Sequence, residues 1–213
     1  MLFLIGNYFL ISEHATLKNL YKHDYVRTHA APSDTGVDAN YSVKQVFSGK
    51  NIPDHIKEQQ CLIMVHYYGF DNRIHRGQIV CNISVADQLK QIFEQLLEVK
   101  FPIYSVIPIH VFDWDDNKSM AANNTSCFNY RKTSSGKWSE HSKGIAIDIN
   151  PLQNHYIKRN GASTPDKAIY QKDKKGTILK NSNIVRLFES INWKWGGNWK
   201  WSKDYQHFSV TGR

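Results

Sequence analysis

The pattern of apolar positions predicts strands in the middle and at the end of the chain. Two apolar runs, 61–70 (CLIMVHYYGF) and 77–83 (GQIVCNI), have the length and composition typical of buried strands. The run 103–112 predicts a third strand, with an edge or kink at Pro108, whose nitrogen cannot donate to a ladder. Residues 144–149 (GIAIDI) and 204–210 (DYQHFSV) predict two more strands.

Alternation within the last two predicted strands separates a core side from a polar side. The isoleucines of the first strand point one way, and Asp148 points the other way. In the second strand, Phe208 and Val210 are expected to face the core, and His207 the opposite side.

Helical spacing occurs in two segments. The first begins after Ser84, where Asp87 completes a predicted capping box, and ends before Pro102. Its apolar face consists of Val85, Leu89, Ile92, Phe93, Leu96 and Leu97. The second segment, 182–191, has the same amphipathic spacing. The tryptophan-rich segment 193–201 that follows is interpreted as core and turn packing, although a role in lining a substrate cleft stays open.

Helices and strands are segregated along the chain rather than regularly alternating. This order predicts an α+β fold, with a single compact domain built on a central antiparallel sheet flanked by helices. We expect a catalytic domain at 61–213 and an N-terminal extension of unclear role at 1–60.

The chain begins with a short apolar segment, MLFLIGNYFLIS, and its first basic residue is Lys18. This segment is a poor signal peptide and too short to span a membrane. A remnant of an export signal and a hydrophobic strand both stay open as interpretations. Nothing else in the sequence resembles a transmembrane helix.

The composition is that of a basic globular protein. Its 41% hydrophobic content excludes disordered and fibrous classes. A formal net charge of +8 favours polyanionic partners such as nucleic acid, anionic lipid or an acidic bacterial cell wall. No nucleic-acid-binding motif accompanies the charge, so no specific nucleic-acid partner is predicted. The densest basic cluster is interpreted as a solvated loop: Lys172, Lys174, Lys175 and Lys180.

The three cysteines, Cys61, Cys81 and Cys127, are far apart in the sequence. The absence of a CxxC pair argues against a thiolate zinc cluster, and the odd number argues against a fully paired disulfide framework. Cys61 and Cys81 can pair, but buried free thiols are the preferred interpretation.

A candidate metal site lies in the segment SEHSKGIAID, residues 139–148. His141 precedes the strand that contains Asp148, and Gly144 lets the backbone turn between them. His207 adds a second imidazole. Two imidazoles and one carboxylate leave a fourth zinc position open, as in catalytic zinc sites. A buried, unpaired Asp148 would be costly, and a metal provides it with a partner.

Two further residues complete a hydrolytic site. Asp204 precedes His207 by three residues, so it can lie beside the metal without binding it. A carboxylate there can take a proton from water activated by zinc and deliver it to the leaving amine. Arg131 can polarise the scissile carbonyl or hold a substrate carboxylate by two hydrogen bonds.

The segment SEHSKGIAIDINP, followed by WGGNW and DYQHF, resembles the M15 family of zinc peptidases, which contains D-alanyl-D-alanine carboxypeptidases and L-alanyl-D-glutamate endopeptidases. The family pattern SxHxxGxAxD and a later acid-x-x-His occur here in order, and the resemblance covers about 61–208. It implies a compact α+β domain with a central antiparallel sheet, shared with the hedgehog signalling domain, and a peptidoglycan substrate.

The resemblance also implies roles for six residues. It implies one Zn²⁺ bound by His141, Asp148 and His207, with Asp204 as general acid and base, Arg131 as the carbonyl or oxyanion contact, and Ser139 as the motif serine that binds substrate. The chain departs from many relatives after Pro151, where Asn154-His155 stands instead of another Asn-Pro pair.

Other metal chemistries fit the sequence less well. The segment beginning at Asp113 starts like a calcium loop, but Lys118 and Asn124 occupy its sixth and twelfth positions. An iron oxygenase also uses two histidines and a carboxylate, but six residues here separate His141 from Asp148. Neither HExxH nor HxxEH occurs. The remaining candidate ligands, His66, His75 and His110, are weaker, and a structural role is preferred for His66.

The sequence therefore predicts a monomeric zinc metallopeptidase that hydrolyses a peptide bond in peptidoglycan stem peptides. Carboxypeptidase and endopeptidase cleavage both stay open, as do an envelope or secreted location and a phage-encoded lysin. The alternative is a non-catalytic zinc-containing module for wall binding or signalling. Asp204 favours the enzyme, because a binding module needs no acid beside its metal.

Overall fold

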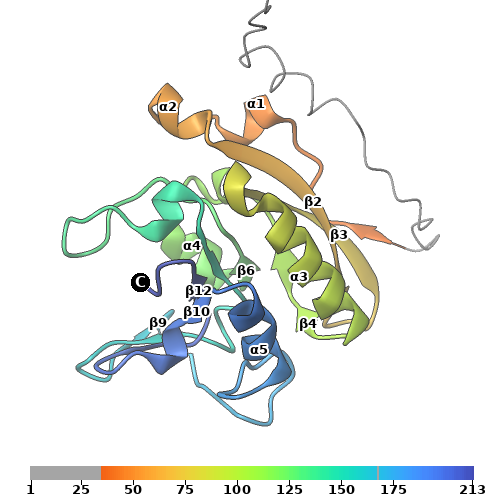
Figure 1. The fold of residues 1–213 in the computed structure, drawn as a ribbon, viewed down its shortest axis with the longest axis vertical. Coiled ribbons are helices and arrows are strands. Elements are labelled where there is room, and N and C mark those ends of the chain that lie inside the picture. Colours follow the sequence, from red (N-terminus) through yellow and green to blue (C-terminus); the bar gives the residue numbers. More distant parts are fainter. Residues whose placement is uncertain (1–34, 167) are drawn as a thin grey trace, which may run out of the picture. The chain divides into compact units, whose positions relative to one another are not determined.

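The computed structural model describes residues 35–166 and 168–213 (Figure 1). Predictions for the apolar N-terminal segment lie outside these residues. Within them, every helix is too short or too polar to cross a membrane.

The longest ladder joins the two central strands that the sequence predicted. Strand β2 (Gln60–Gly69) runs antiparallel to β3 (Ile74–Asn82), with Cys61 opposite Cys81. Two short strands extend this sheet in parallel: β1 (Gly36–Val37) beside β3, and β4 (Pro102–Ile103) beside β2. The sheet order is β1-β3-β2-β4.

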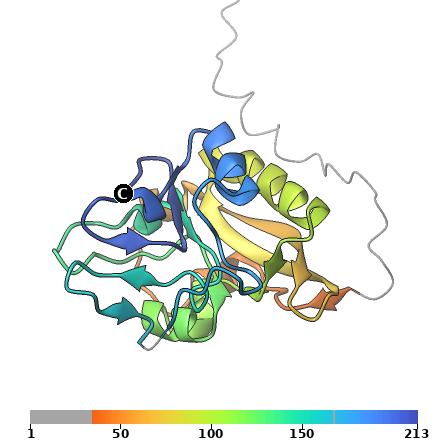
Figure 2. The ribbon, with the colours of Figure 1, turned by 90° about the horizontal axis from the view of Figure 1, so that it is seen from below.

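Helix α3 (Ala86–Glu98) lies along this sheet and packs against β2 (Figures 1 and 2). Its apolar face is buried as predicted, but the predicted cap at Ser84 is wrong. The Asn82 side chain instead accepts hydrogen bonds from the backbone and hydroxyl of Ser84. These bonds form a 3₁₀ turn, η3 (Ile83–Val85), so the α-helix begins only at Ala86.

The predicted strand at 103–112 is interrupted. Only β5 (Ser105–Val106) follows β4, and it pairs in parallel with β6 (Asn124–Thr125). The Asn124 side chain accepts a hydrogen bond from the Ile107 N–H and donates one to the Ile107 carbonyl. Pro108 then precedes the 3₁₀ turn η4 (Ile109–Phe112).

Helix α4 (Asp116–Ala121) begins in the segment that resembled a calcium loop. The Asp115 carboxylate caps this helix by accepting hydrogen bonds from the N–H groups of Asn117 and Lys118. Asp113 pairs with the Lys118 ammonium at 2.7 Å. Both carboxylates therefore have protein partners.

The C-terminal strands form two further sheets. One has the order β10-β12-β7, from Lys194–Trp195, His207–Ser209 and Ala146–Asp148. The other has the order β11-β8-β9, from Lys203–Asp204, Tyr156–Ile157 and Ser163–Thr164. The predicted strand 204–210 is thus divided between two sheets. Val210 is 38% exposed, so the prediction that it faces the core is wrong.

The remaining helical segments are short. Helix α5 (Asn183–Ser190) matches its prediction, with the Ser182 hydroxyl as its N-terminal cap. Helices α1 (Val43–Val46) and α2 (Asp54–Lys57) lie between β1 and β2 in the chain. Two 3₁₀ turns, η5 (Glu140–Lys143) and η6 (Gly196–Asn198), precede β7 and β11.

The mixed α and β composition is confirmed, but the single central antiparallel sheet is not. Strands of the described residues are distributed over four sheets, and three of the pairings are parallel. Most strands have only two or three residues, too few to extend across a common sheet. The main core instead joins side chains of different sheets and helices, including Tyr67, Phe93, Phe188 and Phe208. A second, smaller core includes Val46, Ile52, Val80 and Phe128.

Candidate metal centre

Strand register brings two of the predicted ligands together. His207 lies directly opposite Asp148 in the antiparallel pair β12–β7, so both side chains are on the same face. The third residue, His141, comes from the turn η5, which precedes β7. Gly144 ends this turn in the left-handed conformation, at φ 70°, which a residue with a side chain rarely adopts.

The donor atoms of these residues converge. His207 Nδ1 is 3.0 Å from Asp148 Oδ1, His141 Nε2 is 3.3 Å from the same oxygen, and the two ring nitrogens are 3.2 Å apart. Ligands of tetrahedral zinc at their usual bond lengths lie about 3.3 Å from one another. The triangle of donor atoms therefore has the size of one face of a zinc coordination shell.

Backbone carbonyls fix the orientation of both imidazoles. His141 Nδ1 donates to the Cys127 carbonyl at 2.6 Å, and His207 Nε2 donates to the Arg213 carbonyl at 3.0 Å. In a neutral imidazole, the other nitrogen then carries a lone pair, which here points toward Asp148. Outer hydrogen bonds of this kind orient metal-ligating histidines.

The cluster is nearly closed to solvent. His141, Asp148 and His207 are 3%, 5% and 5% exposed. Burial alone would lower the pKa of His141, but the Asp148 carboxylate overrides burial and raises it. Burial would raise the pKa of Asp148, yet the two histidines hold it well below its usual range. The cluster thus keeps a carboxylate ionised in a buried place, as a metal site requires.

These residues suit zinc by the nature of their donors. Two imidazole nitrogens and one carboxylate oxygen are common zinc ligands, and three protein ligands leave a position for water or substrate. Within the described residues, this is the only cluster of three or more acidic, cysteine or histidine side chains whose ligand atoms converge.

Asp204 lies in β11, three residues before His207. Its Oδ1 atom is shielded from solvent and has no hydrogen-bond donor among the described residues. Burial, followed by the nearby Asp148 carboxylate, raises the pKa of Asp204 to about 7. A carboxyl group with this pKa can both accept and release a proton near neutral pH.

Gly196 of the segment WGGNW lies against both Asp204 and His207. A Cβ atom at Gly196 would come within 2.6 Å of the Asp204 carbonyl oxygen and 3.3 Å of the His207 Cβ. Trp199 adds a ring contact to His207, with centroids 5.5 Å apart. The sequence analysis interpreted this segment as core and turn packing and left open a role in lining a substrate cleft, but it did not predict the contacts with Asp204 and His207.

Arg131 forms an ion pair that the sequence did not predict. Its Nη2 atom is 2.7 Å from Asp116 Oδ2, at the first turn of α4. Asn129 donates to the other Asp116 oxygen at 3.2 Å, and its backbone N–H donates to the His141 carbonyl. The pair contributes electrostatically to the pKa values of both His141 and Asp204, so it is near the cluster. No signal in the sequence distinguished Asp116 from its acidic neighbours.

Ser139 caps the turn that contains His141. Its hydroxyl accepts a hydrogen bond from the His141 N–H at 3.3 Å, and its carbonyl accepts from the Ser142 hydroxyl. Ser139 is 7% exposed. The contacts of its side chain thus position a candidate ligand, and binding of substrate by Ser139 stays a prediction.

The other histidines of interest are outside this cluster. His75 lies between Asp38 and Asp71, with ring nitrogens 3.2 and 3.1 Å from their oxygens, and it stacks on Tyr67. Burial lowers the pKa of His66 and of His110.

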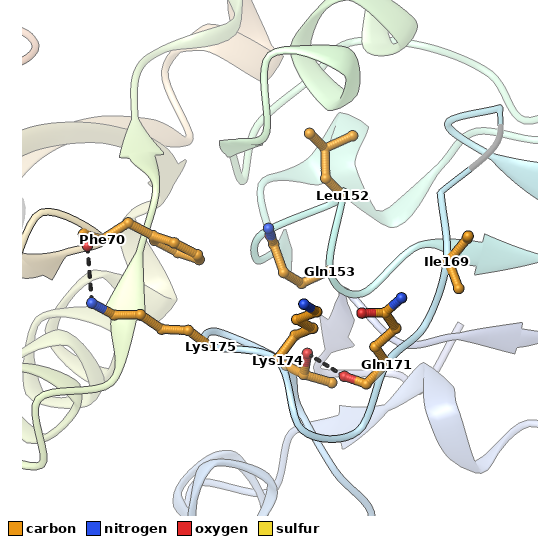
Figure 3. Close-up of a pocket in the computed structure, with 8 residues that line it drawn as sticks. Phe70, Leu152, Gln153, Ile169, Gln171, Lys174 and Lys175 are labelled. Carbon is orange, nitrogen blue, oxygen red and sulfur yellow. Dashed lines mark hydrogen bonds between the residues drawn. The ribbon is translucent and has the colours of Figure 1, made fainter.

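A pocket of about 380 Å³ opens at a different place (Figure 3). It is lined by Phe70, Leu152, Gln153, Ile169, Gln171, Lys174, Lys175 and Thr177. In Figure 3, the Lys175 ammonium reaches the Phe70 carbonyl, at 2.9 Å. None of the residues that line this pocket belongs to the cluster of His141, Asp148 and His207, so the cavity does not mark the candidate metal centre.

Comparison with known protein families supports a peptidase. Residues 132–210 match the family model described as D-alanyl-D-alanine carboxypeptidase, one of the M15 peptidase families. The match confirms the resemblance that the motifs indicated, and it supports a hydrolase of peptide bonds. It covers less than half of the chain and begins one residue after Arg131. The chain has no significant match among curated proteins or solved structures.

Proposed function

We propose that this protein is a zinc metallopeptidase that hydrolyses a peptide bond in peptidoglycan stem peptides. The observation that carries the proposal is the convergence of His141, Asp148 and His207, whose ligand atoms lie as far apart as the ligands of one zinc ion. The match of residues 132–210 to a D-alanyl-D-alanine carboxypeptidase family supports both the reaction and the substrate class.

His141, Asp148 and His207 would hold the ion, which when bound lowers the pKa of water and polarises a carbonyl. Asp204 is the proton carrier. Its shielded carboxylate accepts the proton of the attacking water and delivers it to the departing amine, so one group serves both halves of hydrolysis.

Arg131 is assigned to the substrate side of the site. Its guanidinium is held by Asp116 through Nη2, which leaves other N–H groups to donate to a substrate carbonyl or carboxylate. In particular, the Arg131 Nε atom is buried and has no acceptor among the described residues. A substrate oxygen would provide one.

The test is digestion of purified muropeptides by the full chain, followed by mass spectrometry of the products. We expect one peptide bond to be cleaved, with activity lost in a chelator and restored by added zinc. The product identifies D-Ala-D-Ala carboxypeptidase or L-Ala-D-Glu endopeptidase cleavage. Equal cleavage with and without the chelator would overturn the proposal.

The Asp204→Asn variant separates catalysis from metal binding. We expect it to keep one zinc per chain and to lose at least about 100-fold in kcat, the range of general acid–base contributions. Asp173→Asn is a matched control, because Asp173 is an exposed residue of another loop. A wild-type protein that binds zinc but cleaves no muropeptide would favour a non-catalytic module for wall binding or signalling.

The basic charge of the chain supports action at an anionic cell wall. We therefore propose an envelope, secreted or phage-lysin setting. We also propose that the enzyme is a monomer. Fractionation of the producing cells, with detection of the protein in wall, medium or phage lysate, tests the location. Sedimentation of the purified chain tests the oligomeric state.

A further inference from the structure

Two cysteines outside the candidate metal centre face each other across the longest ladder. Cys61 of β2 is directly opposite Cys81 of β3, and their sulfur atoms are 3.9 Å apart. Opposed residues of antiparallel strands have Cα atoms about 4.5 to 5.5 Å apart. A disulfide requires roughly 4.4 to 6.8 Å between its Cα atoms. The backbone therefore already meets the requirement for a cross-link, and only the side chains must rotate.

We propose that Cys61 and Cys81 are a modification site, a dithiol that a hydroperoxide converts to a reversible cross-strand disulfide, with Cys61 as the thiol that reacts first. This inference does not depend on the proposed hydrolysis.

The surroundings of the two thiols differ in a way that assigns their order of reaction. Cys61 is half-buried, whereas Cys81 has no solvent exposure. The Cys81 thiol can donate to a Cys61 thiolate, and this bond, aided by Lys90 of α3, lowers the pKa of Cys61 against the effect of burial. The thiolate is the reactive form of cysteine, so the accessible partner is also the more nucleophilic one.

Cys127 serves as an internal contrast. It is fully buried, and burial raises the pKa of its thiol. Its sulfur donates to the Gly144 carbonyl at 3.4 Å. Cys127 therefore has neither the exposure nor the low pKa that reaction with an oxidant requires.

The reaction is balanced with one hydroperoxide. The Cys61 thiolate attacks the peroxide oxygen, the O–O bond breaks, and Cys61 becomes a sulfenic acid while the leaving oxygen takes up a proton to give water or an alcohol. The Cys81 sulfur then attacks the Cys61 sulfur, the S–O bond breaks, and the hydroxyl leaves with the Cys81 proton as water. The two sulfurs together give up two electrons, and the peroxide is reduced.

The residues beside this pair hold the turn that contains His141. The Asn82 N–H and side-chain amide donate to the Gly144 and Lys143 carbonyls, at 2.9 and 3.1 Å. The Gln60 amide also donates to the Lys143 carbonyl, at 3.3 Å. A cross-link one residue away would fix the end of the ladder to which this turn is attached.

The experiment treats the reduced full chain with hydrogen peroxide, alkylates the remaining thiols and maps tryptic peptides by mass spectrometry. Arg73 and Arg76 lie between the two cysteines, so trypsin separates them unless they are linked. We expect a Cys61–Cys81 linked peptide that dithiothreitol reverses, with Cys127 recovered in alkylated form. Recovery of Cys61 and Cys81 as free thiols, or of Cys61 as a sulfinic acid without a cross-link, would overturn the proposal.

Variants assign the order of reaction. In Cys81→Ser, a Cys61 sulfenic acid should persist and be trapped by dimedone. In Cys61→Ser, oxidation of Cys81 should be slower by at least about tenfold, because Cys81 is inaccessible. Cys127→Ser is the matched control and should still form the cross-link. If a variant does not fold, alkylation of the reduced native wild type gives the same information, since Cys61 should be labelled first. Equal or faster labelling of Cys81 would contradict the order.

A second readout concerns the attached turn. Oxidation should slow hydrogen exchange of the Asn82 N–H, which donates to Gly144, and should raise the melting temperature by roughly 5 to 10 °C for a loop of this length. Unchanged exchange and melting in fully cross-linked protein would show that the disulfide does not stabilise this part of the fold.

Discussion

His207 and Asp148 occupy directly opposed positions of β12 and β7, with His207 Nδ1 3.0 Å from Asp148 Oδ1. This register places an imidazole and a carboxylate from sequence positions far apart on one face of one sheet. The position of His141 is set separately, by the turn η5 and its contacts with Cys127 and Ser139. The candidate metal centre therefore depends on one strand pairing and one capped turn.

Replacement of Asp148 by Asn tests the metal centre. It removes the charged ligand and leaves two neutral histidines, so zinc affinity should fall by more than about 100-fold, beyond the effect of losing an outer contact. Competition with a chromogenic chelator measures this loss. Asp87→Asn is the control, because Asp87 is an exposed residue of α3 that pairs with Lys90. Zinc affinity equal to that of the wild type would exclude Asp148 as a ligand.

Replacement of Gly196 by Ala tests the support of the site. The added Cβ would be 2.6 Å from the Asp204 carbonyl oxygen, so the backbone of Asp204 must move. We expect a loss of about 1 to 3 kcal/mol in the free energy of unfolding. We also expect kcat to fall by up to about 100-fold, since small displacements of catalytic groups are costly.

Chemical denaturation and steady-state kinetics measure the two effects of this change. Glu94→Ala is the control, because Glu94 is an exposed residue of α3. Full activity of Gly196→Ala would show that the contact does not position Asp204.

The pH dependence of kcat/KM tests the role of Asp204. A general base must be ionised, and the pKa of Asp204 without metal is about 7. A nearby metal cation favours the carboxylate and lowers this pKa. The acidic limb of the pH profile should therefore have its midpoint below pH 7, and Asp204→Asn should remove that limb from the residual activity. A midpoint well above pH 7 would assign the limb to another group.

Replacement of Asp116 by Asn tests its function in positioning Arg131. The change removes the charge that holds the Arg131 guanidinium at 2.7 Å. We expect kcat/KM to fall by about 10 to 100-fold with zinc content unchanged, a loss typical of removing an orienting contact. Asp116→Glu should recover part of the lost kcat/KM. Asp113→Asn, which breaks an exposed ion pair with Lys118, should have no effect. An equally active Asp116→Asn enzyme would contradict this function.

The contacts of His75 predict how stability changes with pH. Burial alone would lower the pKa of His75, but Asp71 and Asp38 raise it above its usual value. The folded state therefore binds the proton more tightly than the unfolded state. This stabilisation is complete below the unfolded pKa of about 6.5 and is lost as the pH rises through the folded pKa.

Chemical denaturation of the wild type and of His75→Gln between pH 6 and pH 9 measures the contribution of His75 to the free energy of unfolding. The difference in their free energies of unfolding should be larger at pH 6 than at pH 9. A difference that does not change, or that grows with pH, would show that His75 is not held in its protonated form.

The sequence alone determined the local elements and the chemical types of the candidate site. Apolar runs identified the strands β2 and β3. Helical periodicity identified α3 and α5, because burial of one helix face leaves a regular trace in the sequence. The motifs identified His141, Asp148 and His207, which the structure brings together.

Only the tertiary structure decided which strands pair and what supports the site. Strands of two or three residues carry too little pattern to specify their partners, so the distribution over four sheets was not predictable. The Asp116 contact to Arg131 and the close approach of Gly196 to Asp204 join residues that share no helix or strand, so no local pattern predicts these contacts. The same holds for the Cys127 and Arg213 carbonyls, which orient the imidazoles as backbone groups and therefore leave no mark in the side-chain pattern.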